Sequence, residues 1–292
     1  MQNKLKGTGV AMVTPFRYDD SIDFNALEKL TEHIVNGGVE FLVVMGTTGE
    51  NPTLTIQEQE AVLNYIAEVS EKKIPIVFGI GGNNTQAVIN RIKKTDFTNV
   101  DAILSAAPYY NKPTQKGLYI HYKSIAGASP IPVILYNVPG RTSVNISAET
   151  TLKLANDFKN IIAVKEASGN FNQVMQILMN KPDNFTVLSG DDTYTLPYIS
   201  LGMEGVISVT ANAYPKEFSD MVRAALKYDI KTSQQLHYKL LEFSNALFSE
   251  GNPGGVKAAL EILGICKKFV RLPLASVSRE TYEKIEELMK KI

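Results

Sequence analysis

Eight short apolar runs, each followed by turn residues, recur along the chain and constrain its fold more than any other feature. Each run is rich in Val, Ile and Leu and too short to be a buried helix, which is typical of strands covered on both faces. We therefore predict eight parallel strands. The runs are Thr8–Val13, Glu40–Met45, Pro75–Ile80, Asp101–Ala107, Pro132–Asn137, Ile161–Lys165, Phe185–Ser189 and Gly205–Val209.

Stretches with helical spacing separate these runs. Asp23 is a candidate N-cap before one apolar stripe, and Thr55 with Glu58 has the spacing of a capping box before another. Strand starts lie roughly 20 to 35 residues apart, and eight βα units in about 230 residues predict a closed (β/α)8 TIM barrel of the α/β class. The alternative, a doubly wound open sheet, normally has a glycine fingerprint after its first strand, where this chain has Thr14–Arg17.

The pattern changes after the eighth run. From Lys231 to Ile292 the sequence shows helical segments and no further strand. These segments are interrupted at Gly251–Gly255 and at Arg271–Pro273, where glycine and proline disfavour a continuous helix. We expect residues 1–230 to form the catalytic barrel and residues 231–292 to form a C-terminal helical subdomain packed on it.

The composition excludes several classes of function. The chain has 292 residues with 30 Lys+Arg and 30 Asp+Glu, so it lacks the basic charge of a nucleic-acid-binding or membrane-surface protein. It has no run of about 18 apolar residues, which argues against a membrane span. Cys266 is the single cysteine, and His33, His121 and His237 lie far apart in predicted helices, so we expect no disulfide, no metal site and a cytoplasmic location.

Polar residues follow several of the runs, at the end of a barrel where catalytic groups gather. Gly46–Glu50 combines two hydroxyls with glycine-flanked amides, which suits either a small anion-binding nest or a tight turn that caps the next helix. Tyr110 and Tyr136 stand at the ends of the fourth and fifth strands. Arg141 follows in a predicted loop, where it is either solvated or pairs with a carboxylate.

Lys165 directly follows the apolar residues of the sixth run. An ammonium held among apolar walls is desolvated, which lowers its pKa and frees a neutral amine that attacks carbonyls. The alternatives are a lysine that extends to solvent at the barrel rim or one that pairs with Glu166. Gly46–Glu50, which we call the hydroxyl loop, lies on the same barrel face as the two tyrosines and the arginine. Together with these groups, Lys165 indicates Schiff-base chemistry on a 2-oxo acid.

Five motifs occur in the order Gly46–Glu50, Pro108–Asn111, Tyr136–Thr142, Val164–Glu166 and Ser189–Asp192. In their residues and order they resemble the motifs of the dihydrodipicolinate synthase (4-hydroxy-tetrahydrodipicolinate synthase) family. This family lies within the class I pyruvate-aldolase superfamily, which includes N-acetylneuraminate lyase. The resemblance extends over nearly the whole chain, and the helical C-terminus fits it too.

The resemblance implies a reaction and a catalytic set. Pyruvate would form an imine with Lys165, and the derived enamine would attack L-aspartate 4-semialdehyde, whose amine would then displace the lysine and close the ring. Thr47 and Tyr136 would form a proton relay that Tyr110 of a neighbouring subunit completes. The family thus implies a homo-oligomer, commonly a dimer of dimers, that works without cofactor or metal in diaminopimelate and lysine biosynthesis.

The same resemblance assigns substrate contacts. Thr47 and Thr48 would bind the pyruvate carboxylate, backbone groups of Gly190 and Ile207 would shape the pyruvate site, and Arg141 would bind the carboxylate of the semialdehyde. The alternative within the superfamily is retro-aldol cleavage of a sugar acid such as N-acetylneuraminate or 2-keto-3-deoxygluconate. Sialic-acid lyases typically carry Ser-Thr in place of the two threonines and lack the arginine, which favours the synthase. A barrel that only senses a 2-oxo acid would not need the proton relay.

Two departures from the family pattern lead to further expectations. Lysine-inhibited members carry histidines and an acidic residue at positions where this chain has other side chains, although Asn83 and Tyr109 are retained. We therefore expect weak or absent feedback inhibition by lysine. The segment Asn252–Lys257 departs slightly from the usual proline-rich version, which we expect to affect helix packing rather than chemistry. The three positions that differ from those of lysine-inhibited members are Ile56, Gln59 and Ala87.

Overall fold

Eight parallel strands close into a barrel in the computed structural model, which describes residues 2–292. Each strand pairs with the next, and β1 also pairs with β8, where Gly7 lies opposite Gly205. The predicted TIM barrel is confirmed, and every predicted strand agrees with an observed one to within two residues at either end. The strands are β1 (Gly7–Ala11), β2 (Phe41–Val44), β3 (Ile76–Gly79), β4 (Ala102–Ala106), β5 (Val133–Asn137), β6 (Ile161–Glu166), β7 (Thr186–Ser189) and β8 (Gly205–Ser208).

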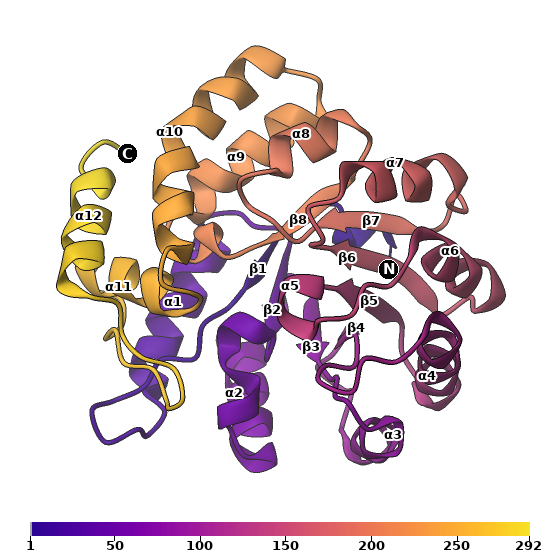
Figure 1. Ribbon diagram of the computed structural model, residues 1–292. Helices are drawn as coiled ribbons and strands as arrows, with labels where there is room; N and C mark the ends of the chain where they lie inside the picture. Colours follow the sequence, from indigo (N-terminus) through magenta and orange to yellow (C-terminus); the bar gives the residue numbers. More distant parts are fainter. Residues whose placement is uncertain (1) are drawn as a thin grey trace.

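Helices connect the strands and form a ring outside them (Figure 1). The Asp23 side chain accepts a hydrogen bond from the Ala26 N–H (3.1 Å) and caps α1, and Thr55 and Glu58 form the predicted capping box of α2. Both caps satisfy N–H groups that have no partner inside a helix. The helices are α1 (Phe24–Asn36), α2 (Ile56–Val69), α3 (Thr85–Lys94), α4 (Gln115–Ala128), α5 (Pro139–Thr142), α6 (Ala148–Asp157), α7 (Phe171–Asn180), α8 (Thr195–Ser200), α9 (Pro215–Leu226), α10 (Ile230–Phe248), α11 (Gly254–Ile262) and α12 (Arg279–Met289).

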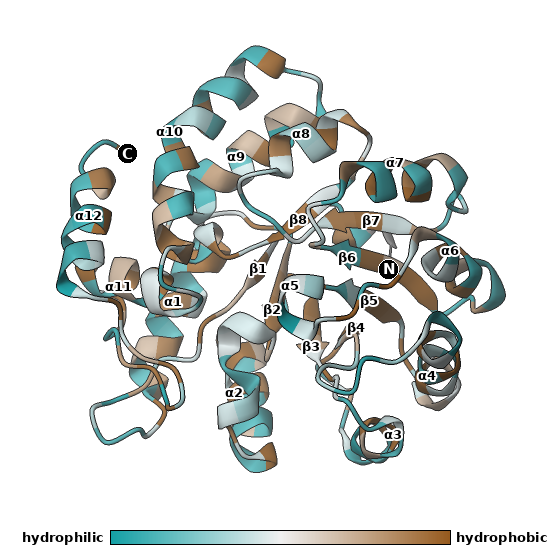
Figure 2. Cartoon of the chain, in the orientation of Figure 1, coloured by the Kyte–Doolittle hydropathy of each residue, from teal (hydrophilic) through white to brown (hydrophobic). Residues whose placement is uncertain are grey.

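The strand residues divide into two apolar clusters according to the face on which they lie. In β5, Ile134 and Tyr136 belong to a cluster made mainly of strand residues, which fills the barrel interior. Val133 and Leu135 belong to the larger cluster that includes the helices. Figure 2 shows the same arrangement, with apolar strands at the centre and hydrophilic residues on the outer faces of the helices. Side chains that alternate in this way are what strands buried on both faces require.

The C-terminal helices α10, α11 and α12 pack against one another, and α10 also packs against α9 of the barrel. In the view of Figure 1 they lie together beyond β1, on one side of the barrel. α12 begins after its N-cap Ser278 and buries Ile285 and Leu288. The predicted helical C-terminus is confirmed, while the division into two domains at residue 230 stays a prediction.

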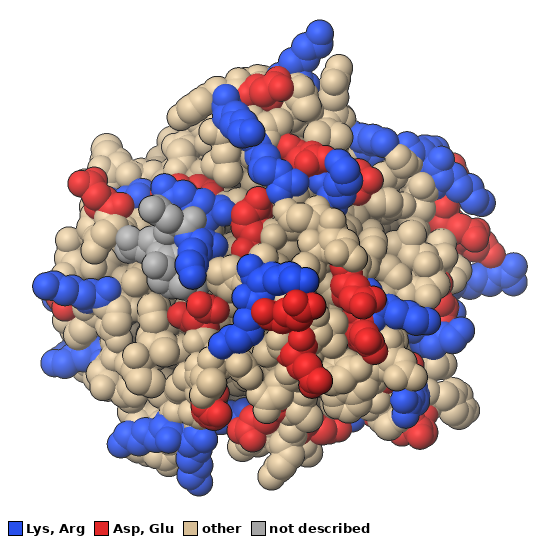
Figure 3. Space-filling view, turned by 180° about the vertical axis from the view of Figure 1, so that it is seen from behind, with Lys and Arg blue, Asp and Glu red and all other residues tan. Residues whose placement is uncertain are grey.

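Acidic and basic side chains are mixed over the surface. Figure 3 shows both signs interspersed on the face that is hidden in Figure 1, in agreement with the balanced numbers of charged residues. This face therefore carries no dominant patch of either sign. Within residues 2–292, no helix combines the length and the apolar character that crossing a bilayer would need.

Candidate active site

Lys165 and Tyr136 lie side by side on the inner face of the barrel. They are opposite each other in the pairing of β5 with β6, and Lys165 Nζ is 4.5 Å from the centroid of the Tyr136 ring. Lys165 is only 5% exposed, and its ammonium has no carboxylate partner among the described residues. The alternatives for Lys165, exposure at the rim and pairing with Glu166, are therefore wrong.

Glu166 faces the opposite side of β6, toward α7. Its buried carboxylate accepts hydrogen bonds from Asn137 Nδ2 (2.9 Å) and from Gln173 Nε2 (3.0 Å). Neutral donors thus stabilise a buried charge that would otherwise be costly. Because Asn137 follows Tyr136 and Glu166 follows Lys165, this hydrogen bond fixes the register of the two strands one residue beyond the lysine and the tyrosine.

Two residues predicted to shape the pyruvate site lie in the same region. Gly190 lies against the Lys165 side chain, since a Cβ at Gly190 would be 3.0 Å from Lys165 Cε and 2.6 Å from Ala167 Cβ. Ile207 belongs to the interior cluster that contains Tyr136. The structure therefore brings four of the predicted site residues together inside the barrel.

Asp192 links the segments that follow β7 and β8. One carboxylate oxygen accepts hydrogen bonds from the N–H groups of Val209 (3.0 Å) and Thr210 (2.9 Å) and from the Thr210 hydroxyl (3.0 Å). The other oxygen is buried without a hydrogen-bond partner among the described residues. Burial raises the pKa of this carboxyl above its ordinary value. Asp192 stands in the quoted motif Ser189–Asp192, but sequence reasoning gave it no role.

The hydroxyl loop Gly46–Glu50 follows β2 and contains the short 3-10 helix η2 (Thr47–Gly49). Its last two amides bond back to the carbonyls of Gly46 and Thr47, at 3.1 Å each. The amides of Thr47 and Thr48 begin the turn and have no backbone carbonyl partner in the described chain. The loop is thus a tight turn that leaves two amides and two hydroxyls for a ligand. Neither Thr48 nor Glu50 caps α2, which has its own capping box. Glu50 stands at the N-cap position of the short 3-10 helix η3 (Asn51–Thr53), but its side chain makes no capping hydrogen bond there.

Tyr110 and Arg141 are exposed and are not packed against Lys165. Tyr110 is 87% exposed, and its backbone has φ 73°, in the left-handed region that strains a tyrosine. Arg141 lies in the four-residue helix α5 rather than in the predicted loop, and it forms no ion pair with another described residue. Both side chains are therefore available to a ligand or to a second chain.

A hollow of about 300 Å³ lies beside the loops that follow β2, β3 and β4. It brings together the five positions that the resemblance associates with lysine feedback. None of the five carries a charge or an imidazole, and the cationic group of the hollow is the guanidinium of Arg91, which pairs with Glu60 (3.4 Å). The five positions are Ile56, Gln59, Asn83, Ala87 and Tyr109.

Cys266 and the histidines lie outside this site. Cys266 is buried, and burial raises the pKa of its thiol to about 12, so it remains an unreactive packing residue at neutral pH. The three histidines lie in α1, α4 and α10, which confirms their predicted helical positions. The described part of the chain gathers no three His, Cys, Asp or Glu side chains that could hold a metal ion.

The C-terminal segment contributes two residues that sequence reasoning missed. Asn252 Nδ2 donates a hydrogen bond to Thr48 Oγ1 (3.0 Å), and the fully buried Lys257 pairs with Glu50 at the end of the hydroxyl loop. The segment thus contacts the hydroxyl loop as well as the helices, and the expectation that its departure from the family pattern affects helix packing rather than chemistry stays a prediction. Lys257 did carry a signal, because a lysine within the apolar run Gly254–Leu260 is buried only with an acidic partner.

Comparison with known proteins agrees with this geometry. A family model described as the Dihydrodipicolinate synthetase family matches residues 4–292. The 4-hydroxy-tetrahydrodipicolinate synthase of Phocaeicola vulgatus is 51% identical over 292 residues, which cover 100% of this chain and 98% of that protein. The likeness thus extends over the barrel and the C-terminal helices alike.

Two solved structures share both the fold and much of the sequence. The chloride-inhibited dihydrodipicolinate synthase of Acinetobacter baumannii, complexed with pyruvate, has a TM-score of 0.95 and 40% identity, with 98% of each chain covered. A monomeric dihydrodipicolinate synthase variant has a TM-score of 0.96 and 36% identity, with 99% of this chain and 97% of that one covered. The chain therefore belongs to the dihydrodipicolinate synthetase family.

Proposed function

We propose that the chain condenses pyruvate with L-aspartate 4-semialdehyde through a Schiff base on Lys165, the reaction of a 4-hydroxy-tetrahydrodipicolinate synthase. The observation that carries this proposal is the Lys165 amine, buried inside the barrel 4.5 Å from the Tyr136 ring and without a carboxylate partner in the described chain. The name of the P. vulgatus relative supports this reaction over cleavage of a sugar acid. The pyruvate complex of the A. baumannii relative supports pyruvate as the first substrate.

In the first half of the reaction the chain activates pyruvate. The Lys165 amine attacks C2, and the carbonyl oxygen leaves as water to give a protonated imine. Thr47 and Thr48 supply hydroxyls and N–H groups for the pyruvate carboxylate at the start of the η2 turn. The imine then accepts the electrons of a C–H bond of the methyl group, whose proton passes to the Tyr136 relay, and an enamine forms.

In the second half the enamine carbon attacks the aldehyde carbon of the semialdehyde. Arg141 binds the carboxylate of this substrate in a bidentate manner, and the Tyr136 phenol, linked through Thr47, gives a proton to the oxygen that becomes a hydroxyl. The substrate amine then attacks C2 of the imine and expels the Lys165 amine, which closes the ring. One water is released overall, and the enzyme returns to its starting state.

We also propose that the active unit is a homo-oligomer, built as a dimer of dimers, in which Tyr110 completes the proton relay of a neighbouring chain. Its exposed ring and left-handed backbone support a role outside its own barrel. A monomeric variant occurs among the structural relatives, so the barrel fold by itself does not require assembly. The oligomer would therefore serve the active site.

Borohydride reduction in the presence of pyruvate tests the Schiff base. Reduction converts the imine to a stable amine, so we expect one pyruvate adduct by intact mass, and peptide mapping should place it on Lys165. Lys165→Ala should form no adduct, whereas the exposed Lys159→Ala should react like the wild type. Folded wild-type protein without an adduct, or with an adduct on another lysine, would contradict the mechanism.

A further inference from the structure

Asn252 reaches the hydroxyl loop from the far end of the chain. It precedes α11 and is 8% exposed, and its Nδ2 donates a hydrogen bond of 3.0 Å to Thr48 Oγ1, a residue 204 positions away. Thr48 is buried as well. The C-terminal segment thus contacts a threonine of the candidate pyruvate site directly.

This hydrogen bond constrains what the Thr48 hydroxyl can do. A hydroxyl has one hydrogen to donate and two lone pairs to accept with. Asn252 occupies one lone pair, and the Thr48 hydroxyl donates to no described residue. Its hydrogen therefore remains available for an acceptor that is not part of the chain, such as a carboxylate.

Lys257 forms a second tie between the same two segments. Its ammonium pairs with the Glu50 carboxylate, donates to the Phe269 carbonyl (2.7 Å) and lies 4.2 Å from the centroid of the Phe16 ring. Its backbone N–H bonds to the Pro253 carbonyl (3.0 Å), which joins the turn after Asn252 to α11. Since a buried ion pair that loses one partner leaves an uncompensated charge, this tie holds the end of the hydroxyl loop firmly against α11.

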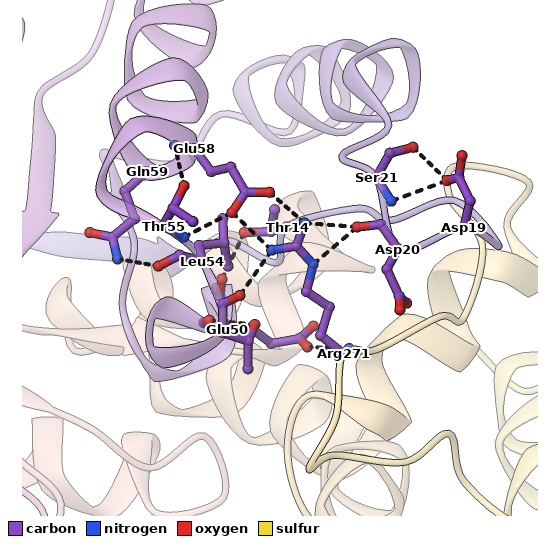
Figure 4. Close-up of polar contacts among 12 residues, drawn as sticks. Thr14, Asp19, Asp20, Ser21, Glu50, Leu54, Thr55, Glu58, Gln59 and Arg271 are labelled. Carbon is purple, nitrogen blue, oxygen red and sulfur yellow. Dashed lines mark hydrogen bonds and ion pairs between the residues drawn. The ribbon is translucent and has the colours of Figure 1, made fainter.

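Arg271 extends the network to the start of α2 (Figure 4). Its backbone N–H donates to the second carboxylate oxygen of Glu50 (3.0 Å), and its guanidinium donates to the Glu58 carboxylate (3.0 Å). The guanidinium also donates to the carbonyls of Asp20 (2.7 Å) and Thr53 (2.9 Å). The C-terminal segment therefore holds the loops that follow β1 and β2.

We propose that Asn252 is a positioning residue for pyruvate binding, because it holds the Thr48 hydroxyl as a hydrogen-bond donor toward the substrate carboxylate. This inference rests on the proposed function, in which Thr48 contacts pyruvate. The C-terminal helices then support the active site instead of forming a separate appendage. Asn252 is argued to act through Thr48, so its loss should weaken pyruvate binding more than it slows the later steps.

Asn252→Ala, Thr48→Val and the double variant test this role in the full-length enzyme. The readouts are the pyruvate concentration that gives half-maximal borohydride trapping, the KM for each substrate and kcat. Asn252→Ala should raise the half-maximal pyruvate concentration about fivefold, the effect of one neutral hydrogen bond, with kcat and the KM for the semialdehyde nearly unchanged. The double variant should match Thr48→Val, because Asn252 acts through that hydroxyl.

Asn252→Asp keeps the shape of the side chain and reverses the hydrogen bond. Its carboxylate accepts the Thr48 hydrogen and places a negative charge near the substrate anion, so half-maximal pyruvate should rise further than in Asn252→Ala. Asn160→Ala is the matched control, since it loses one amide hydrogen bond to the Ala126 carbonyl (2.8 Å) at the opposite end of β6. It should lower Tm and leave half-maximal pyruvate unchanged.

The outcomes separate this inference from the proposed function. Any of three results would overturn the positioning role. Asn252→Ala could need the same pyruvate concentration for half-maximal trapping as the wild type, or the effects of the two single variants could add in the double variant. Asn160→Ala could also raise the half-maximal pyruvate concentration as much as Asn252→Ala does. A wild-type enzyme that forms no pyruvate adduct would overturn the proposed function instead. If Asn252→Ala shows no cooperative thermal transition and is therefore not folded, the half-maximal pyruvate concentration of the isosteric Asn252→Asp tests the positioning role instead.

Discussion

Two neighbours leave the Lys165 side chain little freedom. The Tyr136 ring lies 4.5 Å from its amine, and Gly190 lies against the aliphatic part, where a Cβ would approach Lys165 Cγ to 3.2 Å. Reactions of bound groups depend steeply on geometry, and a displacement of about 1 Å costs on the order of a hundredfold in rate. In the proposed mechanism, the absence of a side chain at Gly190 therefore serves the chemistry as well as the packing.

We predict that Gly190→Ala impairs imine formation. The new Cβ would lie 2.6 Å from Ala167 Cβ, which is not the end of a flexible chain, so the lysine and the strand must both shift. Trapping with pyruvate should slow by about 10- to 100-fold, and stability should fall by about 1 to 3 kcal/mol. Gly127→Ala in α4 is the control, because its Cβ meets nothing within 4 Å. Unchanged trapping in Gly190→Ala would contradict this account.

Between elements, α3 and α4 meet at a buried histidine. His121 of α4 has its Nδ1 2.8 Å from the hydroxyl of Thr85 at the start of α3, and its Nε2 is buried without a hydrogen-bond partner among the described residues. A charged imidazole would lose its hydration there, so burial lowers the pKa of His121 from 6.5 to about 4. The folded chain therefore keeps this side chain neutral at neutral pH.

We predict that His121 makes the fold less stable in acid. The unfolded chain binds a proton below pH 6.5 that the folded chain excludes until about pH 4, so the stability is fully present above pH 6.5 and is lost as the pH falls toward 4. This residue should account for on the order of 2 to 3 kcal/mol of that loss. Urea unfolding near neutral pH and near pH 4 should show that the free energy of unfolding falls less for His121→Gln than for the wild type. Equal losses in both proteins would rule out His121 as the cause.

On the scale of the whole molecule, local sequence patterns predicted the barrel but not its long-range ties. The apolar run Ile161–Lys165 reappears as β6 with one added residue, because strands buried on both faces need such runs wherever they occur. The position of Lys165 at the end of that run likewise predicted its place in the site. The four-residue helix α5 was not predicted, because a single turn is too short to show the periodicity of apolar residues that indicates a helix.

The contacts that hold the hydroxyl loop could not be predicted in the same way. Thr48 contacts Asn252 across 204 residues and Glu50 contacts Lys257 across 207. The apolar run around Lys257 indicates that this lysine needs an acidic partner, but no local pattern shows which residue either partner is. These contacts arise only because closing the barrel brings the segment after α10 back to the end of β2. Sequence motifs therefore gave the candidate ligand-binding residues, and the structure was needed to find the residues that hold the hydroxyl loop in place.

The proposed assembly of two chains around one active site can be tested at Tyr110. Within its own chain the Tyr110 ring is 87% exposed, so we expect its role in the relay to be in the site of a second chain. We predict that Tyr110→Phe lowers kcat about 100-fold, the usual contribution of a proton-transfer group. Lys165→Ala should be inactive, since it lacks the attacking amine.

Mixed dimers of these two variants test whether Tyr110 acts in the active site of the neighbouring chain or in that of its own chain. If Tyr110 completes the neighbour's site, one of the two sites in a mixed dimer combines an intact Lys165 with an intact Tyr110, and about half of the wild-type activity should return. Co-expression with two different tags and sequential purification gives such dimers. The control pairs Lys165→Ala with Tyr136→Phe, where each site keeps a defect and no activity should return. An inactive Tyr110→Phe and Lys165→Ala mixed dimer would show that Tyr110 acts within its own chain. Wild-type activity of Tyr110→Phe alone would show that Tyr110 has no role in the reaction.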